Sequence, residues 1–206
     1  MTEGVIVVGG GYAGLHAARA VAGRGVAVTL VDRDGRHDFV TRLAAVAGGT
    51  APLSDAGRPA EDFVNDVVRG SVAEVADGVV ILEDGRRLEA DAVVLTTGAE
   101  ISRPPIEGIE HAHGLRNSSD ATELRAVIDA SDALVIIGGG ATGVQLAGAA
   151  SIAHPDLRID LLETEPRLLT GMPQDLASGA RRILCDRGVV VRLGDEVERI
   201  TGTGVE

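Results

Sequence analysis

Two short stretches of this sequence carry glycines at the spacing that lets a polypeptide backbone hold a pyrophosphate. Each has the pattern Gly-x-Gly-x-x-Gly after an apolar run, and an acidic residue follows 18 or 20 residues past the last glycine. The residues are Gly9, Gly11, Gly14 and Asp32 in the first stretch, and Gly138, Gly140, Gly143 and Glu163 in the second. One such pattern is weak evidence by itself. Its occurrence twice in the same context makes it informative.

These residue types fit the binding of a dinucleotide. The first glycine permits a tight turn, the second lets the backbone approach the pyrophosphate, and the third lets a helix pack closely on a strand. The unpaired N–H groups at the start of that helix favour phosphate, and the carboxylate can accept hydrogen bonds from ribose hydroxyls. The predicted cofactor-binding residues of the two loops are Gly9, Gly11, Tyr12, Ala13, Gly14, Asp32 and Arg33, and Gly138, Gly140, Ala141, Thr142, Gly143 and Glu163.

The same set of elements must position these residues twice. Residues 7–34 align with residues 136–165, and the register shifts by two only at the sequence HPD in the second copy. The apolar, β-branched run 4–8 predicts a strand buried in a parallel sheet, and the alanine-rich run 12–23 predicts a helix that its glycines end. We therefore predict an α/β protein with two Rossmann-like domains, both incomplete, the first carrying a small antiparallel β-meander.

Between the two copies the sequence predicts the meander and an extended connector. Residues 35–66 are less legible, with a helix over 38–49 and a loop over 50–59 as the interpretation. Three strands are predicted at 66–76, 78–85 and 86–98, with a turn at Asp84–Gly85 between the last two. Pro104 and Pro105 disfavour helix, so the domains are predicted to cover residues 1–108 and 109–206.

The second domain is predicted to contain further elements around its glycine loop. These are helices at 118–131 and 173–188, a strand at 189–193 and part of a strand ladder at 194–206. The first helix opens with a Ser–Asp capping signature. The second is predicted to bury one face that carries Leu176, Ala180, Ile183 and Leu184, and Cys185 beside it is expected to be buried.

Composition restricts the classes of function. A net charge of −12 without a basic run argues against electrostatic binding of nucleic acid or of an anionic membrane. All 19 basic residues are arginine, which excludes a lysine-dependent phosphate loop or Schiff base. The single Cys185 excludes a two-cysteine redox pair, and His111 with His113 lacks a third ligand, so no metal site is expected. No signal peptide or membrane segment is recognisable, and we expect a cytoplasmic chain.

Two dinucleotide sites imply two dinucleotides, for which a bound flavin and an exchangeable nicotinamide are the natural pair. At this point the sequence resembles the two-dinucleotide flavoprotein reductases of the pyridine nucleotide-disulfide oxidoreductase superfamily. It looks most like type II NADH dehydrogenases and the apoptosis-inducing-factor-like and ferredoxin-reductase-like enzymes. The resemblance covers nearly the whole chain. The segments that carry it are VVGGGYAG with Asp32, HDFVTRLAAVAGG, DAVVLTTGA, VIIGGGATGVQLAG and EPRLLTGMP. It implies FAD in residues 1–108 and NAD in residues 109–206.

The resemblance implies further contacts. Backbone around Thr97 and Gly98 is expected near the flavin pyrophosphate and ribityl chain, and Val72 is expected to hydrogen-bond the adenine. Gln145 is expected near the meeting point of nicotinamide and flavin, where the NADH dehydrogenase type usually has glutamate. Glu163 favours NADH over NADPH because a carboxylate repels a 2′-phosphate, while Arg167 leaves a mixed preference open.

Two aromatic residues have open roles. Tyr12 either covers part of the cofactor or packs in the loop. His37 occupies the His-x-Phe position of the NADH dehydrogenase type and either touches the flavin pocket or has a surface or capping role.

The predicted function is an FAD-dependent NADH oxidoreductase that passes electrons to quinone, or otherwise to a small redox protein or oxygen. No catalytic acid, base or nucleophile is predicted, because hydride transfer needs only the proximity and orientation of two rings. The alternative is a nucleotide-binding protein without turnover. Members of the resembled family continue with a Gly-Asp segment for the flavin and a C-terminal interface domain, so we expect a fragment or a chain that needs a second polypeptide, such as a homodimer partner.

Overall fold

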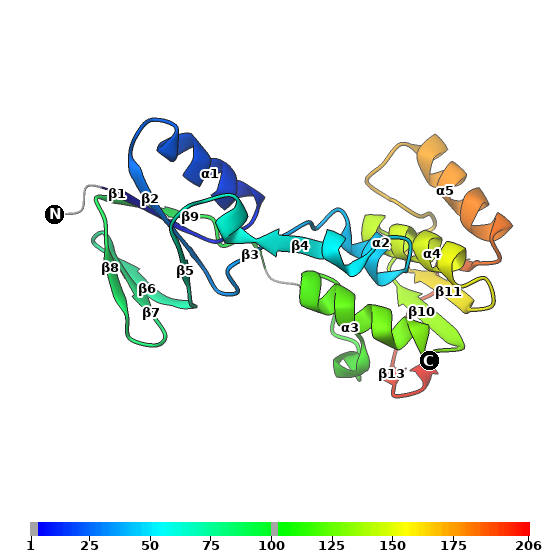
Figure 1. The fold of residues 1–206 in the computed structure, drawn as a ribbon. Helices are drawn as coiled ribbons and strands as arrows, with labels where there is room; N and C mark the ends of the chain where they lie inside the picture. Colours follow the sequence, from blue (N-terminus) through cyan, green and yellow to red (C-terminus); the bar gives the residue numbers. More distant parts are fainter. Residues whose placement is uncertain (1–3, 100–102) are drawn as a thin grey trace. The chain divides into compact units, whose positions relative to one another are not determined.

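The first apolar run of the sequence forms the centre of a parallel sheet in the computed structural model, which describes residues 4–99 and 103–206 (Figure 1). The sheet has the strand order β5-β2-β1-β9, and all three pairings are parallel. Its strands are β1 (Gly4–Val8), β2 (Ala27–Asp32), β5 (Val67–Arg69) and β9 (Ala92–Leu95). Strand β1 has a neighbouring strand on each side and is covered on both faces of the sheet. This burial explains why its residues form a continuous β-branched run.

One layer on this sheet is the predicted helix and the other is the predicted meander. Helix α1 (Tyr12–Ala22) packs Leu15 and Ala18 against Val7 and Leu30 of the sheet. On the opposite face, buried sheet residues pack against Val80 and Leu82 of the meander. The meander is antiparallel and consists of β6 (Val72–Ala76), β7 (Val79–Leu82) and β8 (Arg87–Glu89). The predicted strands 66–76 and 86–98 are each divided between the meander and the main sheet.

The chain forms two compact units, of which the first contains this sheet. It comprises Met1–Asp38 and Gly57–Glu100, and the second comprises Phe39–Ala56 and Ile101–Glu206. Within the first unit, β3 (Arg36–Asp38) pairs antiparallel with β4 (Gly57–Pro59), and the short helix η2 (Ala60–Asp62) follows. The domain assignment to residues 1–108 and 109–206 stays a prediction; of the predicted connector, residues 101 and 102 lie outside the described residues.

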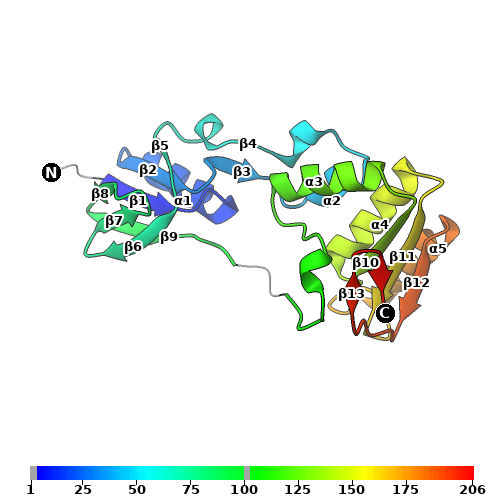
Figure 2. The same cartoon turned by 90° about the horizontal axis from the view of Figure 1, so that it is seen from below.

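The second unit is built on the second copy of the repeat. Its three-stranded parallel sheet has the order β10-β11-β12 (Figure 2). The strands are β10 (Ala133–Ile137), β11 (Arg158–Glu163) and β12 (Val190–Leu193), and the helices are α2 (Leu43–Ala47), η1 (Leu53–Ala56), η3 (Ile109–His111), α3 (Ser118–Asp129), α4 (Ala141–Ala153) and α5 (Gln174–Asp186). The predicted terminal ladder is a hairpin of β13 (Ile200–Thr201) and β14 (Gly204–Val205).

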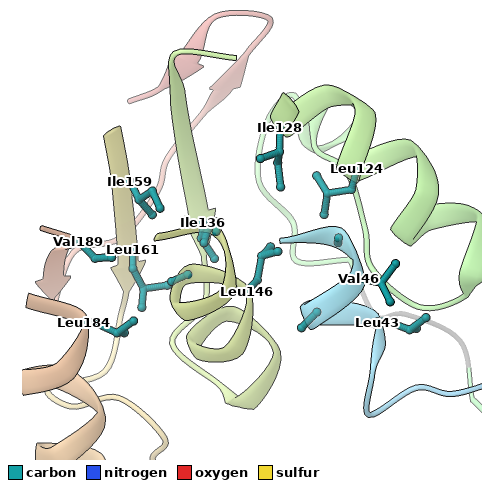
Figure 3. Packing of buried hydrophobic residues seen from close by; sticks show 14 of the residues in the cluster. Leu43, Val46, Leu124, Ile128, Ile136, Leu146, Ile159, Leu161, Leu184 and Val189 are labelled. Atoms are coloured by element: carbon teal, nitrogen blue, oxygen red, sulfur yellow. The ribbon is translucent and has the colours of Figure 1, made fainter. Parts of the chain in front are cut away.

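One apolar core joins the four α-helices of this unit to its sheet. Figure 3 shows buried side chains of β10, β11, α2, α3, α4 and α5 in this core. Helix α2 approaches closely because Gly48 and Gly49 follow it: a Cβ on Gly48 would lie 2.6 Å from that of Ala149 on α4. Arg125 on α3 also donates to the Val46 carbonyl across 3.2 Å.

Three predictions about the helices differ from the structure. On α5 the buried residues are Ala177 and Leu184, whereas Leu176 and Ile183 are about half exposed. The prediction that Cys185 is buried is wrong, because it too is exposed. Helix α3 is capped by Asn117, which with Asp120 forms a capping box one residue before the predicted Ser. None of the helices in the described part of the chain is long and apolar enough to cross a membrane.

Candidate functional site

The first glycine loop turns sharply out of β1 and leads directly into α1. Gly9 has φ +106°, a conformation that favours glycine, and its N–H donates to the Val31 carbonyl across 2.7 Å. The next N–H, of Gly10, donates to Asp32 Oδ2 across 2.7 Å. The first helical bond runs from the Leu15 N–H to the Gly11 carbonyl, so the N–H groups before Leu15 have no partner within the helix.

The second loop repeats this geometry bond for bond. Gly138 also has φ +106°, and its N–H donates to the Leu162 carbonyl across 2.8 Å. The Gly139 N–H donates to Glu163 Oε2 across 2.7 Å. The N-caps have nearly equal dihedral angles, with φ −70° and ψ −176° at Gly11 and φ −71° and ψ −176° at Gly140. The sequence repeat is therefore also a structural repeat.

The glycines of each loop divide into those that the fold needs and one that it does not. A Cβ at Gly14 or Gly143 would collide with the carbonyl oxygen of Gly9 or Gly138, so these glycines let the helix lie against the loop. A Cβ at Gly11 or Gly140 would meet no atom within 4 Å. Open space beside unpaired N–H groups at a helix N-terminus is what a pyrophosphate requires, so both loops fit a dinucleotide.

The two acids hold the loops and keep acceptor capacity. Asp32 accepts the Gly10 N–H with Oδ2 and the Asp34 N–H with Oδ1, the latter across 3.0 Å. Glu163 accepts the Gly139 N–H with Oε2 and the Glu165 N–H with Oε1. Asp32 Oδ1 also accepts the Arg36 N–H, and Glu163 Oε1 also accepts the Thr164 hydroxyl. Three of about four acceptor sites are thus used on each carboxylate, which leaves about one for a ribose hydroxyl.

The environment of Glu163 favours its ionised form. Burial raises the pKa of Glu163, but hydrogen bonds from the N–H groups of Glu165 and Gly139 and from Thr164 outweigh this effect. The net result is a pKa below the usual glutamate value. Glu163 therefore offers a charged acceptor at the end of β11.

The end of β9 completes the first loop through a residue that sequence reasoning missed. Thr96 Oγ1 donates to the Val8 carbonyl across 2.7 Å and lies 3.1 Å from the Gly9 carbonyl. The predicted Thr97 and Gly98 follow it and are exposed. The only signal for Thr96 was its place as the first residue of TTG. In the second loop a Cβ at Gly138 would meet nothing within 4 Å, so none of the described residues takes the place of Thr96 there.

The other predicted residues of the first site lie on α1, after β2 and at the start of β6. Tyr12 and Ala13 are exposed in the first turn of α1. Arg33 is exposed and pairs with Asp34 across 3.4 Å. Val72 begins β6, two residues after Gly70, whose N–H donates to the Asp32 carbonyl.

In the second site, exposed residues open helix α4. Ala141 and Thr142 lie in its first turn, and Gln145 is exposed one turn later. Arg167, the candidate partner for a 2′-phosphate, donates Nη1 to the Met172 carbonyl across 3.0 Å and Nη2 to the Thr170 carbonyl. Its guanidinium is thus engaged with the turn that follows β11.

His37 is buried beside the first loop, at 3% exposure. Its Nδ1 lies 2.9 Å from the Gly10 carbonyl oxygen. Its ring meets Tyr12 edge-on at 4.6 Å between centroids and Phe63 at 5.4 Å. The surface role considered from sequence is therefore wrong, and His37 is a second unpredicted contact of the loop.

The fold and the two loops define an α/β protein with two Rossmann-type dinucleotide-binding units. The chain belongs to the pyridine nucleotide-disulphide oxidoreductase family, whose model matches residues 3–206. This confirms the resemblance and the fold class predicted from sequence.

Known proteins similar to this chain include ferredoxin reductases and a quinone oxidoreductase. It is 30% identical over 212 residues to the biphenyl dioxygenase system ferredoxin–NAD(+) reductase component of Paraburkholderia xenovorans, covering 97% of this chain and 50% of the relative. It is 27% identical over 231 residues to the type II NADH:quinone oxidoreductase of Staphylococcus aureus, covering 94% and 57%. The crystal structure of the covalent putidaredoxin reductase–putidaredoxin complex matches with TM-score 0.82 and 27% identity, covering 97% and 51%. The chain spans about half the length of these proteins.

Proposed function

We propose that this chain carries the two cofactor sites of an FAD-dependent NADH oxidoreductase, with FAD at the first glycine loop and NADH at the second. The observation that carries the proposal is that the second loop repeats the backbone turn and helix start of the first, including the acid that accepts the Gly10 or Gly139 N–H. One nucleotide site would fit many enzymes, but two in one chain fit electron transfer between two dinucleotides. Family membership supports the same reading.

The residues of the chain would bind and orient the cofactors, and FAD when bound supplies the capacity to accept hydride and release electrons. Gly11 and Gly140 leave space for the pyrophosphates, and the N-termini of α1 and α4 offer N–H groups to them. Asp32 and Glu163 would accept ribose hydroxyls. Thr97, Gly98 and Val72 would contact the flavin nucleotide, and Gln145 would lie near the nicotinamide.

A preference for NADH over NADPH is part of the proposal. Glu163 is held as a carboxylate by several N–H groups, and a 2′-phosphate beside it would be repelled. Arg167 supports this preference because its guanidinium is bound to the carbonyls of Thr170 and Met172.

Three classes of acceptor are proposed, quinone first, a small redox protein second and oxygen third. The relative from Staphylococcus aureus is named for NADH and quinone. The relative from Paraburkholderia xenovorans is named for ferredoxin and NAD(+), which favours the second class. Gln145 also favours it, because an uncharged amide cannot relay a proton to a quinone as a carboxylate can.

The test begins with purified protein reconstituted with FAD and titrated with NADH without oxygen. Loss of the yellow flavin absorbance is the expected result, and its return on adding a soluble quinone or a ferredoxin identifies the acceptor class. NADPH serves as the matched reagent for specificity. A protein that cannot be loaded with FAD, yet binds NADH, would instead be a nucleotide-binding protein without turnover.

A further inference from the structure

One residue of the first loop, Gly10, is held through both its N–H and its carbonyl. The Gly10 N–H donates to Asp32 Oδ2, while the Gly10 carbonyl lies 2.9 Å from His37 Nδ1. A carbonyl oxygen can only accept, so Nδ1 carries the proton of this bond. The carbonyl of Gly10 belongs to the same peptide group as the N–H of Gly11, at the start of α1.

The second loop holds the equivalent carbonyl with a different donor. The Gly139 carbonyl accepts the backbone N–H of Leu169 across 2.9 Å. Leu169 has φ +50°, an uncommon conformation for a residue other than glycine. Both donors come from the segment that follows the acid at the end of the second strand. Because the same acceptor is held by an imidazole in one copy and by a strained amide in the other, the bond itself is the shared feature.

The position of His37 is fixed by strand pairing and ring contacts as well as by its bond to the Gly10 carbonyl. It lies in the middle of β3, opposite Arg58 of β4, and its ring is enclosed between Tyr12 and Phe63. Among the described residues it is the only polar or charged one classed as buried. A buried polar ring needs a hydrogen-bond partner, and the Gly10 carbonyl provides one.

We propose that His37 is a positioning residue that orients the Gly10–Gly11 peptide for the pyrophosphate of FAD. In a trans peptide the N–H and C=O point in opposite directions, so fixing the Gly10 carbonyl on His37 directs the Gly11 N–H away from it. Gly11 is exposed and has open space where its Cβ would lie. The inference rests on the proposed binding of FAD at this loop.

Two substitutions of His37 separate the contribution of its N–H donor to FAD binding from that of its ring shape. His37→Phe keeps a flat ring between Tyr12 and Phe63 but removes the donor. His37→Asn loses the ring but keeps an amide N–H near the place of Nδ1. The variants are made in the complete polypeptide that carries these residues, stripped of flavin, and titrated with FAD by flavin fluorescence. NADH binding at the second loop is measured in the same samples as the internal control.

We expect His37→Phe to bind FAD about tenfold more weakly than wild type, as the loss of one buried hydrogen bond implies. His37→Asn is expected to restore the affinity to within about threefold, and NADH affinity is expected to stay unchanged in both. Equal FAD affinity of the Phe variant and wild type would overturn the inference. So would failure of Asn to restore FAD binding, with NADH either kept or lost, since the ring rather than its N–H would then be required. If wild type binds NADH but no FAD, the proposed function fails, and the inference fails with it.

Discussion

Gly11 and Gly140 are the residues at which ligand binding and folding can be separated. Both are N-cap residues with an extended backbone that any residue can adopt, and a Cβ at either would meet no protein atom within 4 Å. We therefore expect Gly11→Val to fold normally and to lose FAD affinity by about ten- to a hundredfold, because valine would occupy the space for the pyrophosphate. Flavin titration measures this loss.

Gly140→Val is the matched control in the second copy. It is expected to weaken NADH and leave FAD unaffected, the reverse of Gly11→Val. If Gly11→Val kept its flavin and lost NADH, the two cofactors would be assigned to the wrong loops. Thermal melting of both variants checks that neither has lost its fold.

Glu163 connects cofactor specificity with pH. Its lowered pKa means that hydrogen bonds in the folded protein favour the charged form. The resulting stabilisation is fully present above the ordinary glutamate value of 4.5 and is lost as the pH falls through the lowered folded-state pKa. Glu163→Gln imitates the protonated side chain. Wild type should therefore melt at a higher temperature than the variant at neutral pH, and the difference should vanish in acid.

The same variant tests the nicotinamide preference. Removing the charge of Glu163 should reduce NADH affinity about five- to tenfold and should not weaken NADPH, since the repulsion of its 2′-phosphate is removed, so that the ratio of the two affinities falls. Equal affinities of the wild type for NADH and NADPH would contradict the role of Glu163. A melting difference independent of pH would contradict its charged state.

Residues whose roles depend on neighbours in sequence were predictable, and those that depend on distant contacts were not. The glycine loops and their acids follow from spacing because a turn, a helix start and a strand end are local. Thr96 reaches Val8 beside the pairing of β1 with β9, and the His37 ring reaches the Gly10 carbonyl through tertiary packing, 88 and 27 residues away in the chain. No sequence pattern states which buried carbonyl a side chain will meet.

At the scale of elements, helix α4 contains one glycine that packing requires and one that it does not. A Cβ at Gly143 would strike the Gly138 carbonyl, whereas the nearest atom to a Cβ at Gly148 is Leu184 Cδ2 at 3.8 Å. Gly143→Ala should therefore lower the free energy of unfolding by about 1–3 kcal/mol. Gly148→Ala should raise it by up to about 1 kcal/mol, since alanine favours helix.

Denaturant titration of the two variants measures the difference. Both add one methyl group to the same helix, so the comparison removes any general effect of the substitution. Equal stability of the two would mean that the loop can move away from α4, and the close approach of helix and strand would not be needed.

Element types were predicted better than element faces and partners. Both βαβ units and the meander were predictable because hydrophobic runs and turn residues specify them locally. The buried face of α5 was misjudged, since Leu176 and Ile183 have helical spacing but Ala177 and Leu184 are the buried pair. The helix expected within 38–49 forms as α2, but its packing in the second unit depends on Gly48 meeting Ala149, a contact between distant segments.

At the scale of the whole molecule, the two copies differ in how their first strands are flanked. Strand β1 has β2 on one side and β9 on the other, whereas β10 pairs with β11 alone among the strands of the described residues. Val135 and Ile137 on β10 are 38% and 39% exposed. The relatives that the chain matches are about twice as long. A further strand or a partner chain on this edge is consistent with both observations.

An unpaired strand with exposed apolar side chains favours pairing between molecules. We therefore expect the 206-residue chain by itself to self-associate as its concentration rises and to bind FAD weakly.

Val135→Lys should reduce the association, because a charge in the middle of β10 opposes edge-to-edge pairing. Light scattering over a concentration series, with the ratio of flavin to protein absorbance in each sample, measures both effects. Val190→Lys on β12, the other edge of the same sheet, tests whether association uses that edge instead. A monodisperse monomer holding one FAD tightly at every concentration would contradict the expectation, and equal association of the two lysine variants would place the contact elsewhere than β10.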